Sequence, residues 1–198
     1  MLDKAELAQR IEAVSQQAAG LIRRPETVVR QLATPFFVRG GIFHVSSRPP
    51  LRPLVFAIGA AEPGFAVLLG GNPPGFVELA SRAGVRLETE LNRVAYATTF
   101  LETTCDLLSG FQIPHSFDDI RPMNKPKPEE QKRFEELRQK YSGVIRPPAT
   151  SAQDPWAVTL FAVRSRNLVA IRARVQPDGR IEVEEKVLEE AIPVPYTK

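Results

Sequence analysis

The sequence has little of what most metal and catalytic sites are built from. Among its 198 residues there is one cysteine, Cys105, and there are two histidines. A single cysteine excludes an intrachain disulfide and a multi-cysteine zinc site. Two histidines exclude a histidine-rich metal site. We therefore expect the protein to work without a metal or another cofactor.

Long apolar runs are also missing. The longest apolar stretches, such as residues 65–69, have the length of a strand, whereas a membrane-spanning helix needs about 18 apolar residues. The first ten residues carry four charges, and no apolar segment typical of a secretory signal follows them. We therefore expect a cytoplasmic protein without a membrane span.

The overall composition is that of a globular protein. Hydrophobic residues make up 43% of the chain and charged residues 25%, which excludes wholesale disorder and fibrous structure. The length fits one domain or two small ones. A chain of this size buries a sizeable core without disulfides or metals.

The periodicity of apolar residues predicts an α+β fold. Four segments have helical spacing and six have the length and composition of strands. Residues 90–108 have strand-like composition but helical spacing, through Leu91, Val94 and Leu101, and their length favours a helix. A short helix is also expected after Pro25. The expected helices are 3–24, 75–83, 90–108 and 128–141, and the expected strands are 36–45, 54–58, 65–69, 156–163, 168–175 and 180–187. Gly40-Gly41 interrupts the first of these strands and suggests a bulge or turn there.

The chain divides at a proline-containing stretch, residues 113–127, which has no periodicity. We expect an N-terminal α+β part, 1–112, then this linker, and then a C-terminal part, 128–198. The C-terminal part is expected to be one helix followed by a three-stranded antiparallel meander. Its sheet has an apolar face that the helix covers only narrowly, so we expect the two parts to pack around one core.

The last hairpin has a register that the sequence predicts. Pro177-Asp178-Gly179 suits a turn with glycine in the left-handed position. If residue numbers of facing partners sum to 356, then Arg174 faces Glu182 and Arg172 faces Glu184 on one side of the sheet. Apolar residues then face each other on the opposite side, and a shift by one residue destroys both matches.

Two segments are candidate protein-binding surfaces. The first helix has a narrow apolar stripe, which packs either on the protein's own core or on a partner or second copy. The prolines of residues 48–53 form a P-x-x-P pattern between two expected strands, which is either a connector or a docking loop. The candidate protein-binding residues are Leu7, Ile11, Val14, Leu21, Pro50 and Pro53.

Charge is distributed unevenly along the chain. The net charge is only +3, but residues 27–61 contain no Asp or Glu, whereas residues 178–190 contain six acids. Arginines of the acid-free region could bind phosphate through bidentate hydrogen bonds, and His44 could stack on a base. The candidate anion or nucleic-acid residues are Arg39, His44, Arg48 and Arg52, and alanine at the three arginines should abolish such binding.

A small-molecule site is the third possibility. The glycine- and proline-rich loop 70–75 lies between an expected strand and an expected helix, where anions bind, but it lacks a phosphate-loop pattern. Cys105 and His115 lie close together in the sequence, although Cys105 falls on an apolar stripe. Asp118 and Asp119, which follow Ser116, are expected to cap a turn.

These patterns favour a non-enzymatic binding or assembly protein, of the adaptor or chaperone type, that acts through protein–protein contacts. Self-association or another protein partner is expected. The alternatives are a nucleic-acid-associated protein that uses residues 23–52, and a small-molecule-binding enzyme or sensor that uses loop 70–75 and His115.

Overall fold

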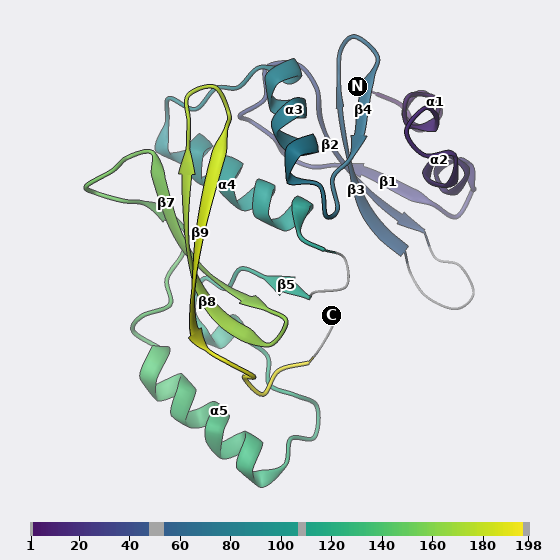
Figure 1. Cartoon of the computed structure of the whole chain (residues 1–198). Coiled ribbons are helices and arrows are strands. Elements are labelled where there is room, and N and C mark those ends of the chain that lie inside the picture. Colours follow the sequence, from purple (N-terminus) through teal and green to yellow (C-terminus); the bar gives the residue numbers. More distant parts are fainter. Residues whose placement is uncertain (1, 48–53, 107–109, 196–198) are drawn as a thin grey trace. The chain divides into compact units, whose positions relative to one another are not determined.

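A computed structural model describes residues 2–47, 54–106 and 110–195. The described residues form helices and two antiparallel sheets, which confirms the predicted α+β class (Figure 1). The chain divides into two compact units. The first comprises Met1–Leu107 with the turn Pro177–Arg180, and the second comprises Leu108–Gln176 and Ile181–Lys198. No helix among the described residues is long and apolar enough to cross a membrane.

The first unit is built on a four-stranded sheet. Its strands follow the order of the chain, and each is antiparallel to its neighbours. The strands are β1 (Val28–Gln31), β2 (Gly41–Ser47), β3 (Leu54–Ala61) and β4 (Phe65–Leu68). Of the expected strand 36–45, β2 contains the part from Gly41 onward. The interruption expected at Gly40-Gly41 is present, because the backbone of Gly40 has a φ of +119°.

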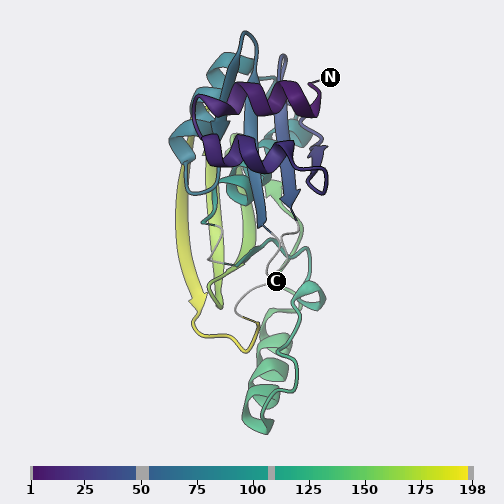
Figure 2. The same ribbon diagram turned by 90° about the vertical axis from the view of Figure 1, so that its right-hand side faces the viewer.

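Two short helices, α1 (Lys4–Glu12) and α2 (Gln16–Arg23), lie side by side over one face of this sheet (Figure 2). Their apolar sides and that face form one core. The core residues are Leu7, Ala8, Ile11, Ala18, Ala19, Ile22, Phe43, Val45, Ile58, Ala60 and Ala66.

The N-terminal segment 3–24 was expected to be one helix, and the structure shows two. Asp3 caps α1 by accepting a hydrogen bond from the Glu6 amide at 2.8 Å. Ser15 starts a second helix by accepting one from the Ala18 amide at 3.2 Å. A serine with its hydroxyl on a backbone amide is a strong N-cap, which ends one helix and begins another.

The short helix expected after Pro25 is a strand. Val28 and Val29 open β1, where they face Ser46 and Val45 of β2. Branching at Cβ favours extended backbone, and the pairing with β2 reinforces that preference.

Helices α3 (Pro73–Ala83) and α4 (Glu90–Thr104) complete the first unit. Helix α3 packs on β3 and β4, where a Cβ on Gly59 would lie 2.4 Å from Leu79 Cδ2. Helix α4 confirms the choice of helix for residues 90–108. Its buried side, however, includes Tyr96 and Phe100, whereas Leu91 on the predicted stripe is 74% exposed.

The buried side of α4 is set by its aromatic rings. Tyr96 packs edge to face on Phe36 and Phe76, with ring centroids 5.2 and 5.3 Å apart. Phe100 packs on Phe76 at 5.2 Å. Aromatic side chains bury more surface than leucine or valine and gain from this geometry, which explains why they determine the orientation.

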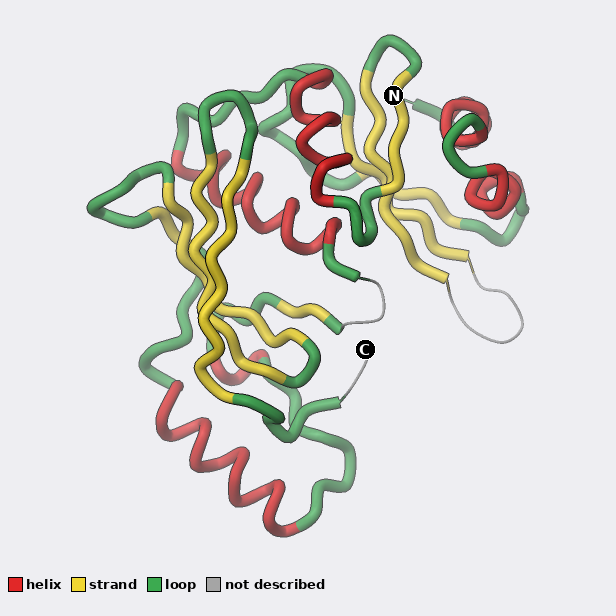
Figure 3. The backbone as a smooth tube through the Cα atoms, in the orientation of Figure 1, coloured by secondary structure: helices red, strands yellow, loops and turns green. Residues whose placement is uncertain are grey.

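The second unit holds the other sheet and helix α5 (Pro128–Tyr141), which has the predicted bounds. The strand order is β5-β7-β8-β9, and β6 also pairs with β7 (Figure 3). The strands are β5 (Phe111–Gln112), β6 (Ala149–Thr150), β7 (Ala157–Arg164), β8 (Asn167–Val175) and β9 (Ile181–Glu189), which confirms the meander.

Residues 113–127, expected to be a linker, belong to the second unit. They contain the 3-10 turn Phe117–Asp119, and both Phe117 and Ile120 are buried in a core with α5. Prolines without periodicity therefore mark an irregular but packed segment. The expectation that the two parts of the chain share one core stays a prediction.

Candidate functional site

The candidate site is the outer edge of β9, which is nine residues long. Among the described residues β9 pairs only with β8, so it ends the sheet (Figure 3). The other edge strands are much shorter: β1 and β4 have four residues each, and β5 and β6 have two. An edge strand offers a row of unpaired N–H and C=O groups to another strand. Among the edge strands of the described residues, β9 offers the longest row.

The β8–β9 hairpin holds this edge in the predicted register. Arg174 faces Glu182, and Arg172 faces Glu184. Gly179 in the turn has a φ of +86°, the left-handed conformation that the sequence suggested. The edge strand is therefore fixed at its first residues by the turn and along its length by β8.

The far end of β9 is fixed by α5. Glu189 accepts hydrogen bonds from Lys140 Nζ at 2.5 Å and from Tyr141 Oη at 2.8 Å. These two donors hold the pKa of Glu189 below its ordinary value, Lys140 first and Tyr141 second. Because both ends are held, little further ordering is needed when another strand pairs with β9.

Two apolar side chains of β9 are exposed. Val183 is 40% exposed and Val187 is 45% exposed. They face Ala173 and Val169 of β8, which are buried, so they extend the apolar face of the sheet to its edge. Apolar area beside unpaired backbone is the combination that favours strand addition.

Two acids of β9 form ion pairs with basic side chains of the same unit. Glu185 forms an ion pair with Arg164 at 3.1 Å, and Glu189 with Lys140. Glu182 and Glu184 lie across from arginines of β8, which also contact Asp154 at 3.0 and 3.5 Å. The acidic C-terminal segment is therefore not a uniformly negative edge.

A groove of about 490 Å³ adjoins this edge on the face that carries Arg172 and Glu184. Its lining combines basic, acidic and apolar side chains of the second unit. They include Arg146, Phe161, Arg172, Glu184, Glu185 and Lys186. The shared residues place the groove directly beside β9, where a chain paired with the edge would reach it.

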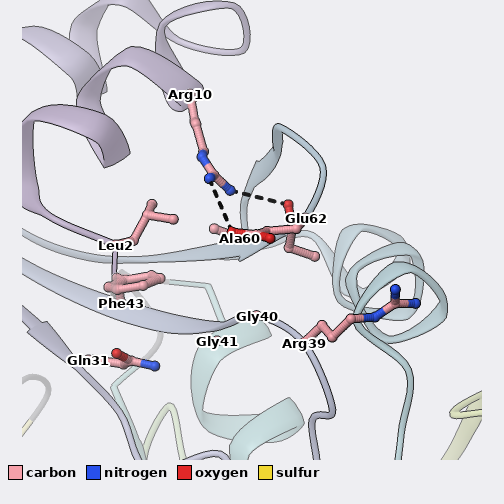
Figure 4. A pocket seen from close by; sticks show the side chains of 10 residues that line it. Leu2, Arg10, Gln31, Arg39, Gly40, Gly41, Phe43, Ala60 and Glu62 are labelled. Atoms are coloured by element: carbon pink, nitrogen blue, oxygen red, sulfur yellow. Dashed lines mark hydrogen bonds and ion pairs between the residues drawn. The ribbon is translucent and has the colours of Figure 1, made fainter.

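A smaller pocket, of about 300 Å³, lies in the first unit (Figure 4). Its Arg10 guanidinium contacts Glu6 at 2.5 Å, Glu62 at 3.7 Å and the Ala61 carbonyl at 3.4 Å. Arg39 also lines the pocket, but Figure 4 shows its side chain directed away from Arg10. The charge of Arg10 is thus already compensated, and the two arginines do not converge on one anion.

The predicted nucleic-acid residues do not form one cluster in the described part of the chain. Arg39 precedes β2 and lines the pocket with Phe43. His44 follows Phe43 in β2, so its side chain lies on the opposite face of the sheet. Arg48 and Arg52 lie outside the described residues. Nucleic-acid binding through these residues stays a hypothesis.

The predicted protein-binding stripe is largely internal. Leu7 and Ile11 are completely buried in the first unit's own core, and Leu21 is half-buried. Val14 is 54% exposed, because it lies in the turn between α1 and α2. The packing corresponds to the alternative in which the helix covers its own core. Pro50 and Pro53 lie outside the described residues.

The loop 70–75 is a closed connection between β4 and α3. The Asn72 side chain accepts a hydrogen bond from the Gly75 amide and donates one to the Leu68 carbonyl. The amides of Gly71 and Asn72 donate to backbone carbonyls, and residues 73 and 74 are prolines without N–H groups. Little of the loop's backbone remains for an anion. The loop belongs to the first unit and His115 to the second.

The potentially reactive side chains near Cys105 and His115 in the sequence form hydrogen bonds and ion pairs within the protein. Cys105 Sγ donates to the Glu102 carbonyl at 3.1 Å. Asp119 accepts from the amides of His115 and Ser116, which lower its pKa in that order, and this confirms the expected cap. Asp118 pairs with Arg138 at 2.5 Å. Within the described residues no group of His, Cys, Asp and Glu could hold a metal ion.

Sequence reasoning found the strand 180–187 and its register but did not identify β9 as the interaction edge. The signal was present in Val183 and Val187, which stand among charged residues in the last strand. What was missing was the order of strands in the sheet.

No protein-family model, curated protein or solved structure matches this chain. The proposals that follow therefore depend on the geometry alone.

Proposed function

We propose that this chain is a binding and assembly protein that pairs with another polypeptide strand along the free edge of β9. The observation that carries the proposal is the length and exposure of this strand. It has nine residues, ends its sheet, and has two exposed valines. Strand addition to a sheet edge is a known mode of peptide recognition, in which backbone hydrogen bonds supply affinity and side chains supply specificity.

The energetics favour a specific rather than a promiscuous contact. A cross-strand side-chain pair contributes about 0.2–1 kcal/mol, and like charges placed opposite each other are unfavourable by similar amounts. β9 combines the apolar Val183 and Val187 with the charged residues 184–186 that lie between them. A strand must therefore match both sets to bind, and charges on an edge otherwise oppose aggregation.

Site-specific photo-cross-linking in cells that naturally make the chain tests this function. A photoreactive amino acid replaces Val183 or Val187, one at a time, in the full chain. We expect adducts with a defined polypeptide from both positions. The same polypeptide, when purified and mixed with the wild-type chain, should slow amide hydrogen exchange in residues 181–189.

The matched control places the same amino acid at Val144, a valine that is 45% exposed and lies outside β9. We expect no adduct from that position. Equal labelling from Val144 and Val183 would contradict the proposal, as would reconstitution that leaves exchange in β9 unchanged.

A further inference from the structure

We propose that the strand that pairs with β9 is β9 of a second copy of this chain, antiparallel, with Val183 facing Val187 and Glu184 facing Lys186 of the other copy. This inference rests on the proposed function, because it names the polypeptide that occupies the same edge. The result is a two-fold symmetric dimer with one sheet continuous through both copies.

Symmetry limits the possible pairings to a few. In an antiparallel pair, the residue numbers of facing partners have a constant sum, and facing residues point to the same side of the sheet. A two-fold axis perpendicular to the sheet keeps each side of the sheet on the same side, so facing residue numbers are both odd or both even and their sum is even. One residue at the centre then faces the same residue of the other copy. The pairing we propose has a sum of 370 and is centred on Glu185.

This pairing matches the exposed apolar residues. Val183 and Val187 are the large hydrophobic residues of β9 that stand out as exposed, at 40% and 45%. A sum of 370 brings each of them against the other in the second copy, twice per dimer. Their exposed area is thereby covered by an apolar neighbour on the same side of the sheet.

The same pairing matches charges on the other side of the sheet. Glu184 and Lys186 are both exposed and lie two residues apart on one face. Each meets the opposite charge of the second copy, which gives two Glu–Lys pairs per dimer. Glu185 lies on the side of the valines and faces Glu185 of the other copy at the centre, but each copy's Arg164 lies 3.1 Å from it and offsets the repulsion.

The neighbouring register fits less well. A sum of 368 places Val183 against Glu185 and centres Glu184 on itself. No ion pair of Glu184 comparable with that of Glu185 and Arg164 compensates this contact among the described residues, because Arg172 lies against Asp154. It also makes Glu182 rather than Glu184 the partner of Lys186, so that the two registers respond differently to substitution.

Charge exchange between copies tests the proposal. E184K and K186E each reverse the charge of one exposed residue in the full chain. Each variant would therefore place two pairs of like charges in its own dimer. We expect either variant alone to raise the dimer dissociation constant about tenfold or more, measured by analytical ultracentrifugation. Mixed in equal amounts they should form a heterodimer, because every 184–186 contact between them is again a pair of opposite charges.

The controls are E136K and K132E, which make the same charge changes on α5, where these side chains lie 4.0 Å apart. They should dimerise as the wild type does, and all four variants should keep the circular-dichroism spectrum of the wild-type fold. E184K that dimerises normally would overturn the proposal, since the 368 register predicts no loss for it.

If the wild-type chain stays monomeric while Val183 cross-links to a different protein, the inference that a second copy pairs with β9 is wrong, but the proposed function stands. A monomer without specific adducts would overturn both. A dimer with the pattern of losses and rescue described above supports both.

Discussion

At the scale of single residues, Gly179 combines a backbone and a packing requirement. Its φ of +86° is strained for other residues, and an added Cβ would lie 3.0 Å from Tyr96 Oη and 3.1 Å from Ala80 Cβ. The Tyr96 hydroxyl donates a hydrogen bond to its carbonyl at 2.5 Å, and burial raises the pKa of this tyrosine. Gly179 therefore has no equivalent substitute in the turn that precedes β9.

We predict that Gly179→Ala lowers the free energy of unfolding by about 1–3 kcal/mol. The alanine would be strained in the left-handed conformation, and its Cβ would crowd the neighbouring side chains. Denaturant-induced unfolding measures the change. The control is Gly143→Ala, where no atom lies within 4 Å of the added Cβ and where we expect little effect. Equal stability of the two variants would show that the turn is not constrained in this way.

Asp119 gives the stability of the second unit a dependence on pH. Amides of His115 and Ser116 hold the pKa of this exposed carboxylate below its ordinary value of 3.8. The folded state thus binds this proton less readily than the unfolded state, so the stabilisation is present above the ordinary pKa and is lost as the pH falls through the lower, folded pKa.

We predict that Asp119→Asn reduces the loss of stability between about pH 5 and pH 3. Unfolding midpoints of the wild type and the variant, measured across this range, test the effect. Two parallel curves would mean that protonation of Asp119 does not contribute.

At the scale of elements, sequence patterns predict best where the decisive contacts are local. Helix α5 and the β8–β9 register are examples. The residues that stop the helix follow it directly, and the charges that face each other belong to adjacent strands of one hairpin. The orientation of α4 could not be predicted in this way. Tyr96 and Phe100 find their aromatic partners on α3 and before β2, far away in the sequence.

The break between α1 and α2 depends on Ser15. We predict that Ser15→Ala lowers the free energy of unfolding by about 1 kcal/mol, because the Ala18 amide loses its acceptor. Chemical denaturation measures the loss. Ser81→Ala, at an exposed position inside α3, serves as the control and should be neutral or slightly stabilising. A similar response of both serines would contradict the capping role.

At the scale of the whole molecule, the division of the chain differs from the one that proline content suggests. The segment 113–127 is rich in prolines but contributes Phe117 to the core of the second unit, at 5.2 Å from the ring of Phe134. Composition alone does not distinguish an irregular packed segment from a linker, because both lack periodicity.

We predict that Phe117→Ala lowers the stability of the second unit by about 3–5 kcal/mol, since it removes a buried aromatic side chain. The chain's single tryptophan, Trp156, lies in this unit, so its fluorescence follows the unfolding. An unchanged transition would mean that residues 113–127 behave as a linker after all.

The candidate site also shows what long-range order adds to a sequence. The pattern from Ile181 to Val187 predicts a strand with one charged face and one face that is apolar except for Glu185. That no described strand covers its outer side follows only from the order β5-β7-β8-β9, which no local pattern reveals. The exposure of Val183 and Val187 is a consequence of that order.

Amide hydrogen exchange as a function of protein concentration tests the central claim most directly. If β9 pairs with β9 of a second copy, amides in residues 181–189 exchange more slowly as the concentration rises, while those of the short edge strand β1 do not change. Exchange in β9 that is independent of concentration, in a sample without any other polypeptide, would contradict the account.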